Sequence, residues 1–236
     1  MTLFFVLGGL LFLALMLASI AQRYHEYVEE RRRRIESILR RVGELETMLW
    51  RIGELPVPVE VERLLRGEVL ARLRIVKQVH ARYRGIDGMI AAAAQALAEV
   101  KPHDAGRLLD HRQLQTLVGV LGEVLWMLRE RRHVSQLTEV TPAQLMRIVA
   151  LRRAECVCRH HLHEAERMRQ EQQLHQALWH CRQITAFINE NGPEDDPQVS
   201  DWYREAQSRA REIEREIRGQ SEMSSVPSPP ESPVSE

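Results

Sequence analysis

Residues 2–22 read TLFFVLGGLLFLALMLASIAQ, and residues 23–52 continue as RYHEYVEERRRRIESILRRVGELETMLWRI. The first run contains no charged side chain, and about 20 apolar residues in a helix are enough to cross a bilayer. Arg residues follow this run and none precedes it, so the positive-inside rule places the N-terminus outside and the remaining chain in the cytoplasm. We therefore expect a single-pass transmembrane anchor at 1–22. The strong preference for Arg over Lys suggests a GC-rich genome, and together with the anchor it makes a bacterial inner membrane the expected location.

A cleaved signal peptide is the competing interpretation of the same run. Ser19 and Ala21 are small residues, three and one positions before a cut that would leave Gln22 first. Signal peptides normally carry a basic segment ahead of their apolar core, and this run has none. The uncleaved anchor is therefore the preferred interpretation.

Apolar residues of the second run recur at alternating steps of four and three, which is the heptad pattern of a coiled coil. Arg31 interrupts this seam, whose other members are Tyr24, Val28, Ile35, Ile38, Val42, Leu45, Leu49 and Ile52. The pattern predicts that the anchor continues as a coiled-coil stalk over 23–55, which ends at Pro56 because proline lacks an amide donor. The partner of the seam is either a second copy of the chain or a later helix of the same chain.

Four consecutive arginines lie in the first part of the stalk, namely Arg31, Arg32, Arg33 and Arg34. An Arg beside an anionic cytoplasmic leaflet gains roughly 1 kcal/mol, so we expect these side chains to contact lipid headgroups. The alternative is that they act only as the topology signal, because nearby Glu residues dilute their charge.

The rest of the chain has a helical pattern, without the alternating β-branched runs that would indicate strands. Thr141 and Pro142 form a helix start, and no strong breaker follows before Gly192, so one helix of about fifty residues is expected there. Other helices are expected over 59–84, 89–100, 105–131 and 199–219, the last of them capped by Ser200 and largely solvated. The fold class is therefore all-α, with an elongated antiparallel bundle over 59–191, an amphipathic helix at 199–219 and a disordered Ser/Pro/Glu-rich tail at 220–236.

Composition excludes some classes of function and constrains the thiols. Acidic and basic residues balance at 33 each, so no net positive charge favours nucleic acid. The cysteines Cys156, Cys158 and Cys181 are odd in number and fall in a segment assigned to the cytoplasm, where we expect free thiols.

One segment, 155–181, is rich in Cys and His, which are the ligands that zinc prefers. On a helix, Cys156, His160, His163 and Glu164 share one face, and they are the candidate metal ligands. They spread over about 12 Å of helix axis, which is more than one coordination sphere covers, and Arg167 is the next residue on that face. We therefore expect no metal and no cofactor, with a metal- or haem-binding sensor as the alternative.

No catalytic motif is visible, and we expect a protein that is not an enzyme, although a site assembled from scattered residues stays open. The heptad seam and the long helices favour a membrane-anchored cytoplasmic scaffold or adaptor. Its expected partners are the membrane and either a second copy of the chain or another membrane or cytoplasmic protein.

Overall fold

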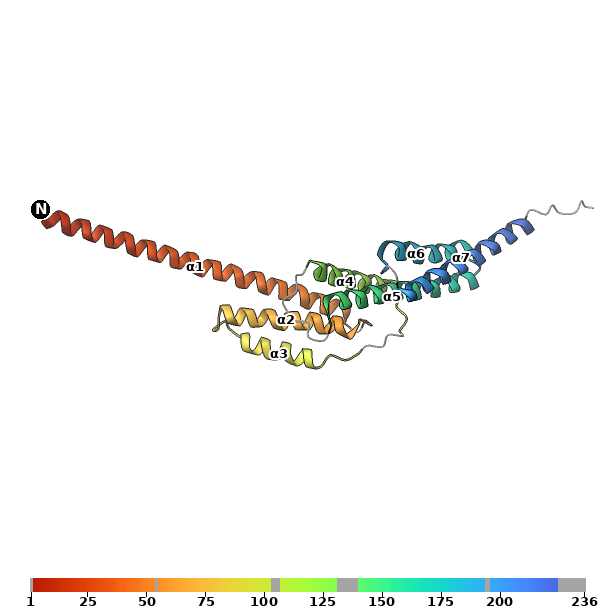
Figure 1. Cartoon of the computed structure of the whole chain (residues 1–236), viewed down its shortest axis with the longest axis horizontal. Helices are drawn as coiled ribbons and strands as arrows, with labels where there is room; N and C mark the ends of the chain where they lie inside the picture. The colour runs from red at the N-terminus through yellow and green to blue at the C-terminus, as the bar shows by residue number, and fades with distance from the viewer. Residues whose placement is uncertain (1, 54, 103–106, 131–139, 194–195, 225–236) are drawn as a thin grey trace, which may run out of the picture. The chain divides into compact units, whose positions relative to one another are not determined.

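The computed structural model describes residues 2–53, 55–102, 107–130, 140–193 and 196–224, with side chains described from residue 15 to residue 221 of these ranges. Within them the chain forms seven α-helices and no β-strand (Figure 1), which confirms the all-α prediction. The helices are α1 (Thr2–Ile52), α2 (Val59–Val79), α3 (Ile86–Ala98), α4 (His111–Arg129), α5 (Pro142–Gln170), α6 (Leu174–Asn191) and α7 (Pro197–Ser224).

The chain divides into two compact units. The first draws its described residues mainly from Met1–Trp50 and Glu62–Val100, and the second from Arg51–Val61, Lys101–His133 and Leu137–Glu236. Each unit buries its own apolar side chains.

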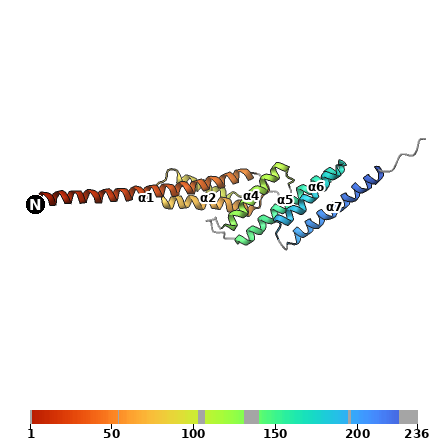
Figure 2. The ribbon, with the colours of Figure 1, turned by 90° about the horizontal axis from the view of Figure 1, so that it is seen from above.

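In the first unit, α1 and α2 lie side by side in both Figure 1 and Figure 2. The seam of α1 is buried there at Ile35, Val42 and Leu45, while Ile38 and Leu49 are half-buried. The facing helix α2 buries an apolar stripe that includes Leu65, Val69, Leu73 and Val76. Over this stretch the seam therefore packs within the chain. Nearer the N-terminus the seam is open, because Tyr24 is 66% exposed and Val28 is 42% exposed.

Arg31, the polar interruption of the seam, has a specific partner. Its guanidinium lies 3.0 Å from Nδ1 of His80, just beyond the end of α2. A guanidinium can only donate, so His80 Nδ1 accepts this hydrogen bond and carries no proton. A single polar pair in an otherwise apolar seam favours one register between two helices.

Among the side chains that the structure describes, no helix offers a stretch long and apolar enough to span a membrane. The expected anchor at 1–22 falls largely on residues 1–14, whose side chains lie outside the described part of the chain. The helical backbone of α1 runs from Thr2 to Ile52.

In the second unit, the prediction of one helix of about fifty residues is wrong, because the chain turns back between α5 and α6. Gln172 has a positive φ of 59°. The Gln173 amide donates to the Met168 carbonyl at 2.8 Å, and the Gln172 amide donates to the Arg169 carbonyl at 3.0 Å. This is a Schellman C-cap, a motif that usually has Gly where Gln172 stands.

The turn is explained by burial rather than by a breaker residue. Met168 before it and Leu174 after it belong to one apolar cluster, together with Ala165, Ala177, Leu178, Cys181 and Ile213. A straight helix would carry these two halves apart along its axis and leave part of the cluster in water. Folding back buries both halves, and each buried aliphatic side chain contributes about 1.5–3 kcal/mol.

The last helix begins earlier and is less solvated than expected. α7 starts at Pro197, and Oδ1 of Asp196 accepts a hydrogen bond from the Gln198 amide at 3.0 Å. Ser200 is therefore inside the helix and not its cap. α7 also continues to Ser224, past the expected start of the tail, and residues 225–236 of that tail lie outside the described residues.

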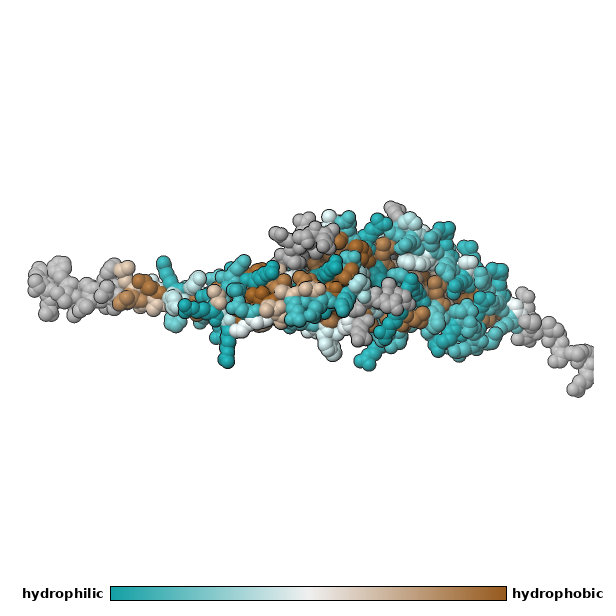
Figure 3. All heavy atoms as spheres, turned by 90° about the horizontal axis from the view of Figure 1, so that it is seen from below, coloured by the Kyte–Doolittle hydropathy of each residue, from teal (hydrophilic) through white to brown (hydrophobic). Residues whose placement is uncertain are grey.

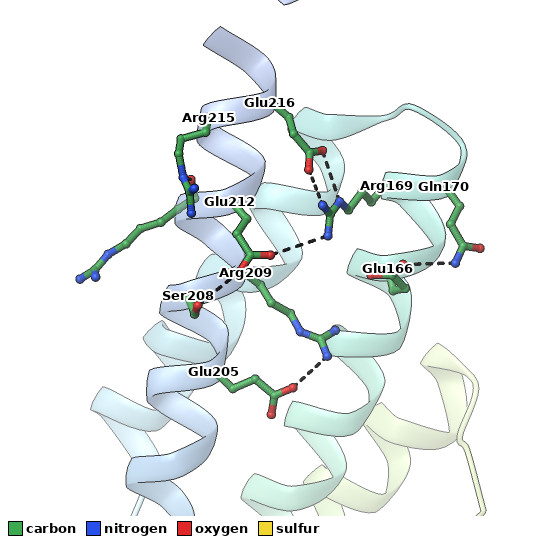
Figure 4. Close-up of polar contacts among 10 residues, drawn as sticks. Glu166, Arg169, Gln170, Glu205, Ser208, Arg209, Glu212, Arg215 and Glu216 are labelled. Atoms are coloured by element: carbon green, nitrogen blue, oxygen red, sulfur yellow. Dashed lines mark hydrogen bonds and ion pairs between the residues drawn. The ribbon is translucent and has the colours of Figure 1, made fainter. Parts of the chain in front are cut away.

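Ion pairs fix α7 against the α5–α6 hairpin (Figure 4). Arg169 on α5 donates to the Glu216 carboxylate and lies 3.8 Å from that of Glu212. Arg182 on α6 is 3.1 Å from Glu214. Val199, Ala206 and Ile213 are buried beneath these pairs. The polar face of α7 is thus partly used for intramolecular packing.

Candidate functional site

Histidines gather around an open cleft of about 650 Å³ in the second unit. α5 contributes His160, His163, Glu164 and Arg167, α6 contributes Trp179 and His180, and the start of α4 contributes His111. Leu108, Leu109 and Asp110, which precede α4, complete the wall. Sequence reasoning identified the α5 residues but not His111, Trp179 or the leucines, because only the fold brings them to α5.

His160 is the deepest ring of the cleft, with 6% of its surface exposed. Its Nδ1 lies 3.0 Å from the carbonyl oxygen of Leu109. Because a carbonyl can only accept, Nδ1 must carry the proton, and in the neutral ring Nε2 carries the lone pair. The chain therefore fixes both the orientation and the tautomer of this imidazole.

His161 and His180 form a second pair, with their Nδ1 atoms 2.8 Å apart. One nitrogen must donate and the other must accept, so both rings cannot be protonated at these positions. Burial, and then the neighbouring rings of His160, His180 and His111, together lower the pKa of His161 to about 4. Burial also lowers the pKa of His180. The pair is neutral at pH 7.

Glu164 forms an ion pair with Arg167 at 2.6 Å on the rim of the cleft. Burial opposes ionisation of this carboxyl and is the largest single effect, but the hydrogen bond from Arg167 and the attraction of its positive charge together outweigh burial and lower the pKa of Glu164. The rim therefore carries a carboxylate and a guanidinium at pH 7.

The cysteines are buried free thiols, as expected for Cys156, Cys158 and Cys181. Burial raises the pKa of Cys156 to about 11 and that of Cys158 to about 12. The thiolate is the reactive and metal-binding form, so these thiols are poor nucleophiles and poor ligands at pH 7.

The candidate metal ligands do not form one set. His160, His163 and Glu164 line the cleft, but Cys156 is not among the lining residues. Over the described ranges, no group of three or more His, Cys, Asp or Glu side chains is arranged to hold a metal ion.

A second concave surface lies in the first unit, between α1, α2 and α3. This groove has a volume of about 420 Å³ and is lined by Glu46, Leu49, Arg66, Val69, Leu73, Met89, Ala92, Ala93 and Ala96. Most of these side chains are apolar, and Glu46 and Arg66 supply the charges. We call it the α1–α3 groove.

The four consecutive arginines differ in their surroundings. Arg31 is half-buried and bonded to His80, whereas Arg32, Arg33 and Arg34 are exposed. Arg32 pairs with Glu36 at 2.8 Å, and Arg33 pairs with Glu29 at 3.3 Å. Exposed pairs of this kind contribute about 0–1 kcal/mol, so they are easily exchanged for other anions.

Comparison with known proteins adds no family assignment: no family model, no curated protein and no solved structure matches the chain. The function is therefore inferred from the exposed surfaces of the chain and from the α1–α3 groove.

Proposed function

We propose that this protein is a membrane-anchored cytoplasmic scaffold or adaptor, which presents a helical surface to a partner protein. Residues 1–22 serve as the single-pass anchor, with the N-terminus outside and the C-terminus in the cytoplasm. Exposed apolar side chains support this role, since Leu15, Met16, Leu17 and Ile20 are 49–62% exposed on α1. Figure 3 shows hydrophobic atoms on the surface at the N-terminal end of the coloured part of the chain. Arg32, Arg33 and Arg34 follow at the position where anionic headgroups would lie.

The observation that carries the partner-binding proposal is the α1–α3 groove. Amphipathic helices bind in apolar grooves through side chains spaced by three and four residues. Alanine has a short side chain, so the backbone of a partner helix can approach α3 closely at Ala92, Ala93 and Ala96. We propose the groove as the partner-binding surface in place of the heptad seam, because Ile35, Val42 and Leu45 of the seam are already buried within the chain.

Paired substitutions on α3 test this function. Ala92 and Ala98 are both exposed, but only Ala92 lines the groove. Three full-length proteins would be compared: wild type, Ala92→Arg and Ala98→Arg. Each would be extracted from membranes in mild detergent and captured together with whatever binds to it. A stoichiometric partner, or a dimer measured by sedimentation, should persist with Ala98→Arg and be lost with Ala92→Arg. Equal retention by both variants would exclude the groove as the binding surface.

The anchor is tested separately by topology and extraction. A C-terminal reporter that is active only in the cytoplasm should be active, and the protein should stay in the membrane after an alkaline wash. An inactive reporter, or release by the wash, would contradict the anchored orientation.

A further inference from the structure

The heptad seam of α1 continues toward the N-terminus beyond the part that α2 covers, and Figure 1 shows α1 extending past α2 on this side. In steps of four and three, the seam positions before Ile35 are Arg31, Val28, Tyr24, Ala21 and Leu17. Arg31 has its partner within the chain, because His80 beyond the end of α2 accepts its hydrogen bond. The next four positions are exposed, with Leu17 at 58%, Tyr24 at 66% and Val28 at 42%. We call these four residues the open seam, which is about 16 Å long at 1.5 Å of rise per residue.

The charged side chains around the open seam point away from it. In a heptad the seam consists of positions a and d, and positions e and g flank it. None of the flanking residues beside the open seam is Asp, Glu, Lys or Arg, since these positions hold Ala18, Ile20, His25 and Tyr27. The charged residues fall at positions b, c and f, and they are Arg23, Glu26, Glu29 and Glu30. Residues 23–30 thus have one apolar face and one charged face, which is the pattern of a helix that packs against another helix.

A second copy of the chain fits this apolar face, because it brings the same seam in the same heptad phase. Two copies anchored through residues 1–22 have the same orientation in the membrane, so their α1 helices run parallel. In a parallel pair each seam position meets its own counterpart, and e and g positions of the two helices face each other. At the open seam this brings no like charges together. The next seam position is Arg31, where two guanidiniums would repel each other and where His80 is the partner instead.

We propose that two copies of the chain form a parallel dimer through the open seam of α1, with Tyr24 and Val28 in contact with their counterparts beside the membrane. This inference rests on the anchored orientation proposed above, which makes the two helices parallel. The contact ends at Arg31, because α2 occupies the seam beyond it and the two copies separate there. The α1–α3 groove of each copy stays free for a different protein, so the dimer offers two grooves and gains avidity toward a partner with two binding segments.

Disulfide cross-linking of the full-length protein in isolated membranes tests this contact. Tyr24→Cys places a thiol on the open seam, and the control Glu26→Cys places one on the charged face two residues away. A disulfide needs two Cα atoms about 4.4–6.8 Å apart, which a parallel pair provides at position 24 and not at position 26. After addition of an oxidant, Tyr24→Cys should give a covalent dimer. Glu26→Cys should not, and neither should wild type, whose three thiols are buried.

A charge placed on the open seam should separate the two copies. Val28→Glu brings two carboxylates together in the dimer, whereas Gln22→Glu adds the same charge at position b, away from the seam. Sedimentation in mild detergent should give a dimer for wild type and for Gln22→Glu, and a monomer for Val28→Glu at the same concentration. Ala92→Arg should stay dimeric, because the α1–α3 groove is not part of this contact.

Several results would overturn the proposal. Equal cross-linking of Tyr24→Cys and Glu26→Cys would indicate random collisions in the membrane. If Tyr24→Cys resists an alkaline wash and still does not cross-link, the anchor stands, but lipid covers the open seam in place of a second copy. Release by the wash would refute the anchor itself, and with it the parallel arrangement. A dimer that is lost in Ala92→Arg and kept in Val28→Glu would assign self-association to the groove.

Discussion

Gln172 provides a sharp test of the α5–α6 hairpin, because the effect of glycine there should have opposite signs in a hairpin and in a straight helix. In the hairpin, Gln172 occupies the C′ position of a Schellman cap with φ 59°. A left-handed conformation costs an L-residue about 1–2 kcal/mol, and glycine adopts it freely at an entropic cost of about 0.5–1 kcal/mol. Replacing alanine by glycine should therefore stabilise the hairpin by about 0.5–1 kcal/mol.

In a straight helix the same replacement would be destabilising. Glycine in a helix interior is about 1 kcal/mol less favourable than alanine. The two structures thus predict free energies of unfolding that differ by roughly 1.5–2 kcal/mol at this one position. Comparing Gln172→Gly with Gln172→Ala removes the contribution of the Gln220 side chain, whose Nε2 lies 3.3 Å from Oε1 of Gln172.

The matched control is Glu166, an exposed residue one turn before the end of α5. Glu166→Gly should be less stable than Glu166→Ala by about 1 kcal/mol, because the position is helical. Urea unfolding of the full-length protein, followed by tryptophan fluorescence, to which Trp126, Trp179 and Trp202 of the second unit contribute, gives the four free energies. A difference of 1 kcal/mol moves the midpoint by roughly 0.3–1 M urea.

The reasoning would be refuted if glycine were less stable than alanine at both positions. That result would mean that Gln172 is helical and that α5 and α6 form one rod. Opposite signs at the two positions would establish the turn without further structural work.

Acid should weaken the second unit, because unfolded His161 binds a proton more tightly than folded His161, whose pKa is about 4 against an ordinary 6.5. The free energy of unfolding is unaffected by this group above pH 6.5 and falls by up to roughly 2–3 kcal/mol as the pH approaches 4. In His161→Gln the urea midpoint should therefore depend less on pH than in wild type. Leu45→Ala should cost about 2–5 kcal/mol because this side chain is fully buried in the first unit. Trp50→Ala, at a residue 82% exposed, should change thermal stability by less than about 0.5 kcal/mol. His80→Ala should cost about 1–3 kcal/mol by leaving the half-buried Arg31 without its acceptor, and equal stability of this variant and wild type would show that the pair has no structural role.

The sites illustrate how far sequence reasoning reaches. His160, His163 and Glu164 could be placed on one helical face from their spacing alone, and all three line the cleft. His111 lies about fifty residues away in sequence and carries no local signal that connects it with them. The α1–α3 groove was not predicted for a similar reason: Leu49, Val69 and Ala92 come from three helices, and each looks like an ordinary core residue in its own segment.

The sequence by itself determined the all-α class, the extent of α1 and the apolar seam, because helical periodicity and proline act locally. Free thiols were predicted from the odd number of cysteines and the expected cytoplasmic location, and the three cysteines are unpaired in the structure, although an odd number by itself requires only one free thiol. Only the tertiary structure decided that the seam of α1 is buried within the chain, and that Arg31 meets His80 in it. The turn at Gln172 also belongs to the tertiary structure. It has no glycine or proline to mark it, and it forms because Met168 and Leu174 are buried together only when the chain folds back. Local signals specify where a helix can form, and burial of apolar surface between distant segments specifies where it must end.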